Sequence, residues 1–511
     1  MTGKRLCTHM ALFALGLANT LHAQIQVDYQ LSKIDEGVAW VSSYWGYNTP
    51  KLVYDGDTFY TVGLWGEQQS TSTGVIYKLE DGSWRRGYSW DDLDYQPGTI
   101  LLDSEGRLVL IYPRISAGPV VLRSVAPGDI DHFESIPVPA AIGKAGYLGA
   151  GIFDDRIVLG YIGDPNTYSF VVAVLDLATQ QWSGPQVLAE AQRQEEPWTT
   201  WLYPIIQPDA DGFHLVVSNN ADLSSYYDRM LYMYVPFDDM ANPRVEQIAR
   251  VDPWTENLAF AEAMWRSPDG AVYVTGQYKP EDETNQLFVY RRDPRTEEWT
   301  DHLVSGSQVA AVFESAHDTG RLWMPSTYGS QLRLYSSTDA ASTWQLASLP
   351  DFADADLIST FFLYGITPAS GSVMPDVPTA VFSAGPHPNY QLWFVQFDTE
   401  SVPTAVVEED AAARPERMDL RQNFPNPFNA ETTVHFELVE LVEPAVIDLT
   451  VYGITGQKVA TLARGWRAGG AHTLKWNGRD EAGRPMASGV YLYRLRAGVG
   501  VELTRRMLLL R

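Results

Sequence analysis

The sequence predicts an all-β protein of two domains, on three observations. The composition is 45% hydrophobic and 12% aromatic, with 40 Gly and 31 Pro, which supplies both a large core and frequent turns. Short alternating strands separated by Asp/Gly turns recur between residues 45 and 398. An acidic, Ala/Pro-rich stretch, residues 401–416, then precedes a second set of alternating strands and is typical of a linker.

The amino terminus has the pattern of a secretory signal peptide. Lys4 and Arg5 precede a short apolar stretch, residues 10–17, and the segment 1–23 ends on small and polar residues. We therefore expect the mature protein to be exported. The single cysteine, Cys7, lies in this segment, which excludes disulfides and cysteine chemistry from the rest of the chain.

Turn signals in the central region recur at nearly constant spacing. The spacings between successive first positions are 48, 51, 55, 60, 49 and 52 residues, close to the length of a four-stranded propeller blade. Residues 24–400 are therefore predicted to form a seven-bladed β-propeller. The turns are Asp55-Gly56, Asp103–Gly106, Asp154-Asp155, Asp209–Gly212, Asp269-Gly270, Asp318–Gly320 and Ser370-Gly371.

The seventh unit is one strand short. It supplies only three strands, at 361–366, 378–384 and 391–397, whereas the segment 25–43 has strand character but no partner of its own. We expect this N-terminal segment to complete the seventh blade, which removes exposed sheet edges.

One hairpin carries a recognisable motif. Ser337-Thr-Asp-Ala-Ala-Ser-Thr-Trp344 resembles the Asp-box of sialidase-like (BNR/Asp-box) propellers, with Ala341 where that motif has glycine. In those families the box is a turn and packing device, so the resemblance supports a propeller fold and does not imply sialidase activity.

The C-terminal region, residues 417–511, is predicted to be a small Ig-like β-sandwich. Its alternating segments are 432–438, 446–452, 472–476 and 490–495. Several motifs in order resemble the C-terminal sorting domain of type IX (Por) secretion cargo: residues 422–429, 451–459, 476–480, 488–494 and 507–511.

That resemblance implies a secretion route and a partner. It implies a Bacteroidota-type bacterium, passage through the periplasm, and export by the type IX machinery, which binds residues 417–511, to the cell surface or the medium. The alternative is a generic Ig-like adaptor, because a related sandwich occurs in flagellar hook-capping proteins.

Charge restricts the partners of the central region. Residues 24–416 contain 22 basic and 54 acidic groups, which argues against nucleic acid as a partner. After the signal peptide no run of about 18 apolar residues follows, so no transmembrane segment is predicted.

Standard catalytic motifs and cofactor fingerprints are absent, and no cofactor is predicted. Asp209–Gly212 begins like a calcium loop but has Asn220 at position twelve, which favours a hairpin turn and leaves calcium as the weaker alternative.

Aromatic and polar residues gather in the segments that precede first strands and follow second strands. Aromatic rings stack on sugar faces while amides and guanidinium groups pair with hydroxyls and carboxylates, so these segments predict a glycan site. The predicted ligand-binding residues are Tyr47, Asn48, Trp65, Tyr95, Arg114, Tyr147, Trp201, Tyr203, Asn219 and Arg229. The structural alternative is that these rings are wedges between blades.

We therefore predict binding, with cleavage as an open question, of an extracellular polysaccharide. A polysaccharide lyase would use a tyrosine, with Tyr47 and Tyr95 as candidates, or a histidine as base, and Arg114 or Arg229 would neutralise a uronic carboxylate. A hydrolase would draw on paired carboxylates among Asp91, Asp92, Asp94, Glu195, Glu196 and Asp228. Sialidase is disfavoured because the arginine motif of that family is missing. The competing hypothesis is a non-catalytic adhesion or protein-binding scaffold.

Overall fold

The structure of the protein is a computed structural model. The described residues are 25–38, 49–66, 73–91, 98–114, 117–163, 169–190, 200–220, 227–251, 258–279, 286–305, 308–310, 313–314, 321–328, 331–350, 360–385, 390–399, 419–429, 431–438, 445–453, 457–467, 470–480, 484–497 and 501–510. Their regular structure is strand throughout, apart from two short 3₁₀ helices.

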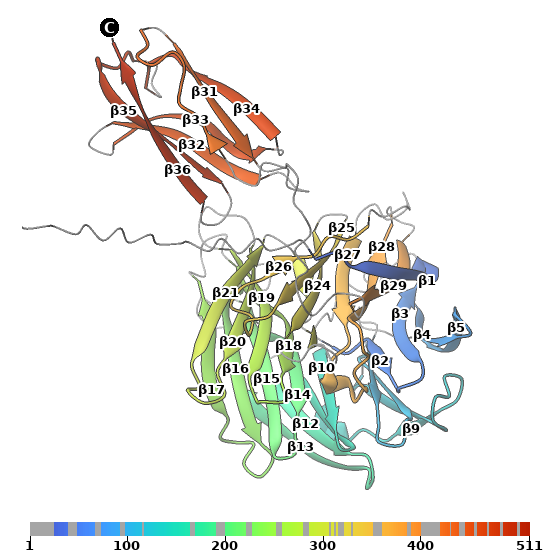
Figure 1. Ribbon diagram of the computed structural model, residues 1–511. Helices are drawn as coiled ribbons and strands as arrows, with labels where there is room; N and C mark the ends of the chain where they lie inside the picture. Colours follow the sequence, from blue (N-terminus) through green and yellow to red (C-terminus); the bar gives the residue numbers. More distant parts are fainter. Residues whose placement is uncertain are drawn as a thin grey trace, which may run out of the picture. The chain divides into compact units, whose positions relative to one another are not determined.

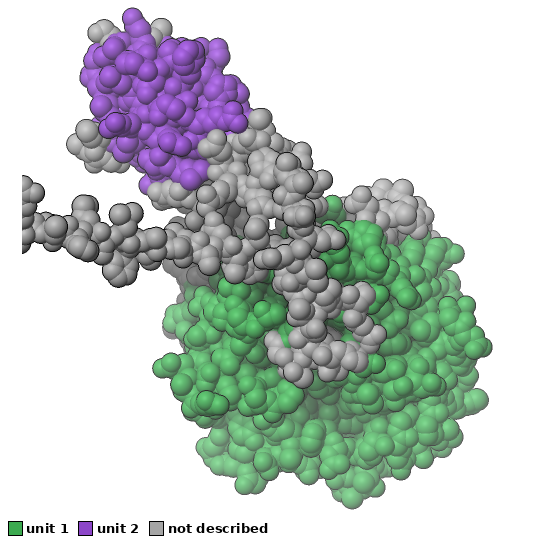
Figure 2. All heavy atoms as spheres, in the orientation of Figure 1, with its two compact units in different colours: residues 1–407 green, residues 408–511 purple. Residues whose placement is uncertain are grey.

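The chain divides into two compact units, Met1–Val407 and Glu408–Arg511 (Figure 2). Among the described residues of both units, no helix is long and apolar enough to cross a membrane.

Unit 1 is a series of antiparallel strand groups, most of them of four strands, which resemble propeller blades (Figure 1). The strands are β2 (Leu52–Tyr54), β3 (Phe59–Trp65), β4 (Thr73–Glu80) and β5 (Ser83–Trp90); β6 (Thr99–Leu102), β7 (Leu108–Tyr112), β8 (Val120–Ser124) and β9 (Phe133–Ile136); β10 (Gly146–Phe153), β11 (Arg156–Ile162), β12 (Phe170–Asp176) and β13 (Gln181–Ala189); β14 (Trp201–Pro208), β15 (Gly212–Asn220), β16 (Tyr227–Pro236) and β17 (Arg244–Arg250); and β18 (Leu258–Arg266), β19 (Val272–Lys279), β20 (Gln286–Arg292) and β21 (Trp299–Ser305).

The last two sheets depart from this simple pattern. One contains β22 (Gln308–Ala310), β23 (Phe313–Glu314), β24 (Leu322–Tyr328), β25 (Gln331–Ser337) and β26 (Gln345–Leu346), with β22 and β23 both paired to β24. The other has the order β27 (Thr360–Gly365), β28 (Thr379–Ala384), β29 (Tyr390–Asp398) and β1 (Asp28–Val38), and the β1–β3 pair joins it to β2–β5 as one eight-stranded sheet.

The N-terminal strand closes the series. β1 pairs antiparallel with β29 from Asp28↔Asp398 to Val38↔Tyr390, and Val38 also pairs with Trp65 of β3. The prediction that the N-terminal segment supplies the missing strand of the seventh unit is therefore confirmed. The first strands β2, β6, β10, β14, β18, β22 and β27 contact one another in succession, so they form the innermost layer.

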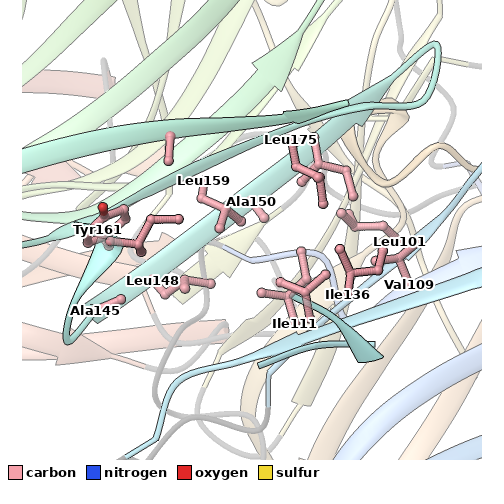
Figure 3. Close-up of a cluster of buried hydrophobic side chains, with 14 of the residues drawn as sticks. Leu101, Val109, Ile111, Ile136, Ala145, Leu148, Ala150, Leu159, Tyr161 and Leu175 are labelled. Atoms are coloured by element: carbon pink, nitrogen blue, oxygen red, sulfur yellow. The ribbon is translucent and has the colours of Figure 1, made fainter. Parts of the chain in front are cut away.

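The core of unit 1 lies between neighbouring sheets. Figure 3 shows one such cluster, in which Leu101, Val109 and Ile111 of one sheet pack against Leu159 and Leu175 of the next. Strands buried on both faces explain the continuous Val, Leu and Ile runs of the sequence.

The predicted Asp-box forms a tight turn. Asp339 Oδ1 accepts the Thr343 N–H at 2.9 Å and the Ser337 hydroxyl at 2.8 Å. Ala341 has φ of +70°, in the left-handed region that favours glycine, which explains why the motif usually has glycine there.

The expected turn at Ser370-Gly371 is a longer connection. Residues 366–378 join β27 to β28 and contain the 3₁₀ helix η3 (Pro368–Ser370), which contacts β6, β10 and β14. We call this connection the strap. Val373 N–H donates to Tyr54 O at 3.0 Å, so the strap also contacts β2.

Unit 2 contains two antiparallel sheets, as a sandwich requires. One contains β30 (Asp419–Leu420), β31 (Thr432–Leu438) and β34 (Gly470–Trp476); the other has the order β33 (Lys458–Arg467), β32 (Ala445–Gly453), β35 (Gly489–Ala497) and β36 (Val501–Leu509). β33 and β36 were not among the predicted strands.

Candidate functional site

The strands of unit 1 end on two opposite faces. On one face, tight turns join most first strands to the second strands of the same sheet, and we call it the turn face. The other carries the connections from second to third strands and from one sheet to the next, and we call it the connection face. The described members of the predicted set lie at or next to the strand ends of the connection face: Trp65, Arg114, Tyr147, Trp201, Tyr203, Asn219 and Arg229.

Three predicted residues lie side by side on β14, β15 and β16. Trp201 pairs with Asn219, and Asn219 pairs with Arg229. The guanidinium carbon of Arg229 lies 5.5 Å from the centre of the Trp201 ring, a cation–π distance. Trp201 is buried, so its ring packs against the Arg229 guanidinium and is not exposed for stacking on a sugar.

A buried carboxylate holds the other side of this arginine. Asp228 is 1% exposed; its Oδ2 lies 3.0 Å from Arg229 Nε, an ion pair whose alignment falls short of a hydrogen bond, and its Oδ1 accepts from Asn219 Nδ2. The terminal nitrogens of Arg229 have no hydrogen-bond partner within the described part of the chain, and a quarter of its side chain is exposed. The guanidinium is therefore held in place and presents its bidentate edge.

Two more polar atoms lie beside this group. Thr200 Oγ1 and Asn220 Oδ1 are buried and make no hydrogen bond to described residues, while Asn220 N–H donates to Thr200 O at 2.8 Å. Buried polar atoms normally have a partner, so both are candidates for contact with a ligand or an ordered water.

An aromatic cluster adjoins the arginine group. Tyr147 of β10 and Tyr203 of β14 have ring centres 5.0 Å apart, and Phe260 of β18 lies 5.4 Å from Tyr203 and 4.8 Å from Tyr227. Tyr147 and Tyr203 have φ of +48° and +55°, at register shifts of their strands. Bulges and left-handed non-glycine residues cost free energy and often re-aim side chains next to functional sites.

The structure therefore brings five predicted residues together: Tyr147, Trp201, Tyr203, Asn219 and Arg229. Trp65 lies apart on β3, 44% exposed, with the Arg86 guanidinium 5.4 Å from its ring. Arg114 is half-buried and donates from Nε to Gly118 O at 2.9 Å. Tyr47, Asn48 and Tyr95 lie outside the described residues.

Sequence reasoning missed Lys51, which directly precedes β2. Its side chain is buried, and burial lowers its pKa from 10.5 to about 7. No sequence signal distinguishes it, because lysine is ordinarily an exposed residue.

The Asp209–Gly212 segment is a hairpin turn of the turn face, as predicted. Asp209 Oδ1 accepts the N–H groups of Asp211 and Gly212, and Oδ2 contacts His214 Nε2 at 3.2 Å and Arg266 Nη1 at 2.9 Å. The His214 hydrogen bond, ahead of the backbone bonds, lowers the pKa of Asp209 to about 2 against the opposing effect of burial. Burial also lowers the pKa of His214.

Comparisons with known proteins agree with the two-part fold. The model of the FlgD Ig-like domain matches residues 426–499. No curated protein matches the chain. Among solved structures, a PL25 polysaccharide lyase, an ulvan lyase bound to -[GlcA(1-4)Rha3S]-, is 12% identical over 71% of this chain and 95% of its own, with a TM-score of 0.54. The same type of lyase without the sugar is 13% identical over the same shares, with a TM-score of 0.53.

At these identities the likeness concerns the fold alone. Unit 1 is an all-β domain of propeller-like sheets, and the C-terminal unit contains a domain similar to the FlgD Ig-like family.

Proposed function

We propose that the protein binds an anionic extracellular polysaccharide on the connection face of a seven-bladed propeller. The observation that carries this proposal is Arg229, whose guanidinium is held between Trp201 and Asp228 with its terminal nitrogens free of described partners. A planar guanidinium presented in this way suits bidentate pairing with a carboxylate or a sulfate.

The strand groups support the proposed number of seven blades. β2–β5, β6–β9, β10–β13, β14–β17, β18–β21, β22–β26 and β27–β29 with β1 each supply one, and the turn spacings of the sequence support the same number. In this arrangement ligands meet the ends of the innermost strands at the mouth of the central channel.

The nature of the ligand is supported by the rest of the site. Unit 1 is strongly acidic, so its net charge does not attract anions at long range and anion binding depends on local contacts such as that of Arg229. The structurally similar ulvan lyase holds a sugar chain that contains GlcA, a uronic acid. Thr200 and Asn220 add polar atoms suited to hydroxyl groups.

Cleavage by β-elimination is the second candidate activity, favoured by the likeness to a lyase. In that reaction Arg229 neutralises the uronic carboxylate, which makes the neighbouring C–H more acidic, and a base removes that proton. Tyr147, Tyr203 and Tyr227 of the aromatic cluster are candidates for this proton transfer.

The test is incubation of the mature chain with neutral, sulfated and uronic polysaccharides, following retention and new unsaturated or reducing ends. We expect uronic or sulfated chains to be retained, and unsaturated ends if elimination occurs. Loss of a bidentate charged contact, about 1.5–3 kcal/mol, predicts that Arg229→Gln weakens binding by about one to two orders of magnitude, roughly 10- to 150-fold.

The matched control is Arg156→Gln. Arg156 also stacks on an aromatic ring, 4.4 Å from Phe237, but it lies at the turn end of its sheet. Equal effects of the two substitutions, or retention of no anionic chain, would refute the site, and retention of a protein partner alone would favour the scaffold hypothesis.

We also propose that residues 417–511 direct export by a type IX secretion system, after the signal peptide 1–23 has led the chain to the periplasm. The ordered motifs of the sequence support this route. Expression of the full chain and of a chain ending at residue 400 in a type IX-secreting bacterium tests it: only the full chain should reach the surface or the medium. Secretion of both would refute the sorting role.

A further inference from the structure

Trp65 is an exposed tryptophan on the connection face, on a different strand group from Arg229. It is the last residue of β3, and 44% of its surface is exposed although the six residues before it in the strand are buried. Of the tryptophans of unit 1 that the structure describes, it alone is exposed. Its ring therefore contributes little to the core and is available to a ligand.

The ring is held in place by its surroundings. Trp65 pairs with Thr73 of β4 on one side and with Val38 of β1 on the other, so its backbone belongs to two ladders. The guanidinium carbon of Arg86 lies over the indole, 5.4 Å from the ring centre, a cation–π distance. Arg86 thus supports the ring while much of the indole remains open to solvent.

Arg86 is itself fixed by a carboxylate. Its Nε and Nη2 donate to the two oxygens of Asp35 at 2.7 and 2.5 Å, and the Tyr77 hydroxyl donates to Asp35 Oδ2 at 2.6 Å. The Asp35 side chain is 9% exposed. Because Asp35 occupies the bidentate edge of Arg86 and neutralises its charge, this arginine is a support for the ring and not an anion-binding group.

Polar groups suited to sugar hydroxyls lie beside the ring. Thr73 is directly opposite Trp65, so the two side chains share one face of the sheet. The Thr73 hydroxyl donates to Oδ1 of Asp91, an exposed residue that directly follows β5. Hydroxyl and carboxylate oxygens accept hydrogen bonds from sugar hydroxyls, whereas the negative charge of Asp91 repels an anionic sugar.

We propose that Trp65 is the stacking platform of a second carbohydrate site, which takes a neutral sugar ring. The apolar face of that ring lies on the indole, and its hydroxyls pair with Thr73 and Asp91. This inference goes beyond the proposed function, because the Arg229 site takes an anionic group and belongs to another strand group. Each site is defined by its own contacts, so either can be correct without the other.

The experiment is affinity electrophoresis of the mature chain in gels that contain a neutral polysaccharide: xylan, glucomannan or β-glucan. We expect at least one of them to retard the wild type. Trp65→Ala should weaken that binding about tenfold or more, the loss typical of an aromatic anchor, and Trp65→Phe should retain part of it. The matched control is Phe153→Ala, which should behave as wild type: Phe153 is also 44% exposed but lies at the turn end of β10.

A second measurement does not depend on the folding of a variant. Oxidation of wild-type tryptophans by N-bromosuccinimide, mapped by mass spectrometry, should slow at Trp65 several-fold when the neutral polysaccharide is bound. An unprotected Trp65 in the bound protein would overturn the platform.

The two sites are distinguished by their ligands. Failure of every neutral polysaccharide to retard the wild type, or equal retardation of wild type and Trp65→Ala, would overturn the Trp65 site and leave the proposed function standing. Retardation by a neutral chain without retention of any anionic chain would support the Trp65 site and refute the Arg229 site.

Discussion

The strap supplies a sharp test of packing at the inner layer, through the substitution Gly371→Ala. Gly371 has φ of +76°, and a Cβ built on it would lie 2.0 Å from Leu102 O and 2.9 Å from Ile152 Cγ2. Gly82, in the β4–β5 turn, has the same φ of +76° but nothing within 4 Å of its Cβ position. The two glycines therefore share their φ and differ in the space around them.

The two variants separate backbone strain from steric conflict. Gly82→Ala should cost about 1–2 kcal/mol, the left-handed penalty of an L-residue. Gly371→Ala should add about 1–3 kcal/mol of overpacking, because backbone atoms must move to admit the methyl group. Such a movement also strains the bonds that Tyr54 makes with Val373 N–H and Ser372 Oγ.

Differential scanning calorimetry of the mature chain measures the difference. At roughly 2 °C per kcal/mol for a large domain, Gly371→Ala should lower the propeller transition by several degrees more than Gly82→Ala. Equal shifts would show that the strap gives way easily and is not packed against Leu102, and the strap would then be no fixed part of the inner layer.

Three further predictions concern stability. Asp209→Asn should destabilise unit 1 by about 1 kcal/mol at pH 7 after allowance for solvent screening. The folded pKa of Asp209 is depressed to about 2, largely by His214, so this contribution is present above pH 4 and shrinks as pH falls toward 2. A difference in melting temperature between the variant and wild type that is the same at pH 7 and pH 3 would contradict this prediction. Leu159→Ala, in the cluster of Figure 3, should cost about 2–5 kcal/mol, measured by the same calorimetry. Asn423→Ala in unit 2 should cost about 1–3 kcal/mol, because it leaves Thr432 Oγ1 without its 2.8 Å donor, and a transition of unit 2 unchanged in urea would count against that role.

Local patterns predicted much of the fold. The strand at 432–438 was predicted with the bounds of β31, and the Asp/Gly signals at Asp55, Asp103 and Asp209 mark turns between paired strands. Turn-forming residues and the alternation of hydrophobic and polar residues act over a few positions, so the sequence predicts turns and strands directly. β33 and β36 were missed because their hydrophobic alternation is interrupted by arginine and glycine.

The candidate site was predicted in part. The sequence identifies residues in the connecting segments but does not show which of them are neighbours in space. Trp65 and Arg114 were therefore grouped with Arg229, although they belong to other strand groups. The open sugar platform expected at Trp201 is a buried support, since Arg229 stacks over it from a strand two positions away in the sheet.

By itself, the sequence determined the all-β class, the turns at Asp55, Asp103 and Asp209, the acidic character of unit 1 and the strand that closes it, since these follow from local patterns and composition. The predicted turn Asp318–Gly320 lies outside the described residues. Tertiary structure alone decided which side chains contact one another and which are buried away from water. Lys51 is perturbed because residues 313 positions further along the chain, around Tyr364, exclude water from its amine. Such long-range burial depends on the packing of whole sheets, and no short stretch of sequence encodes it.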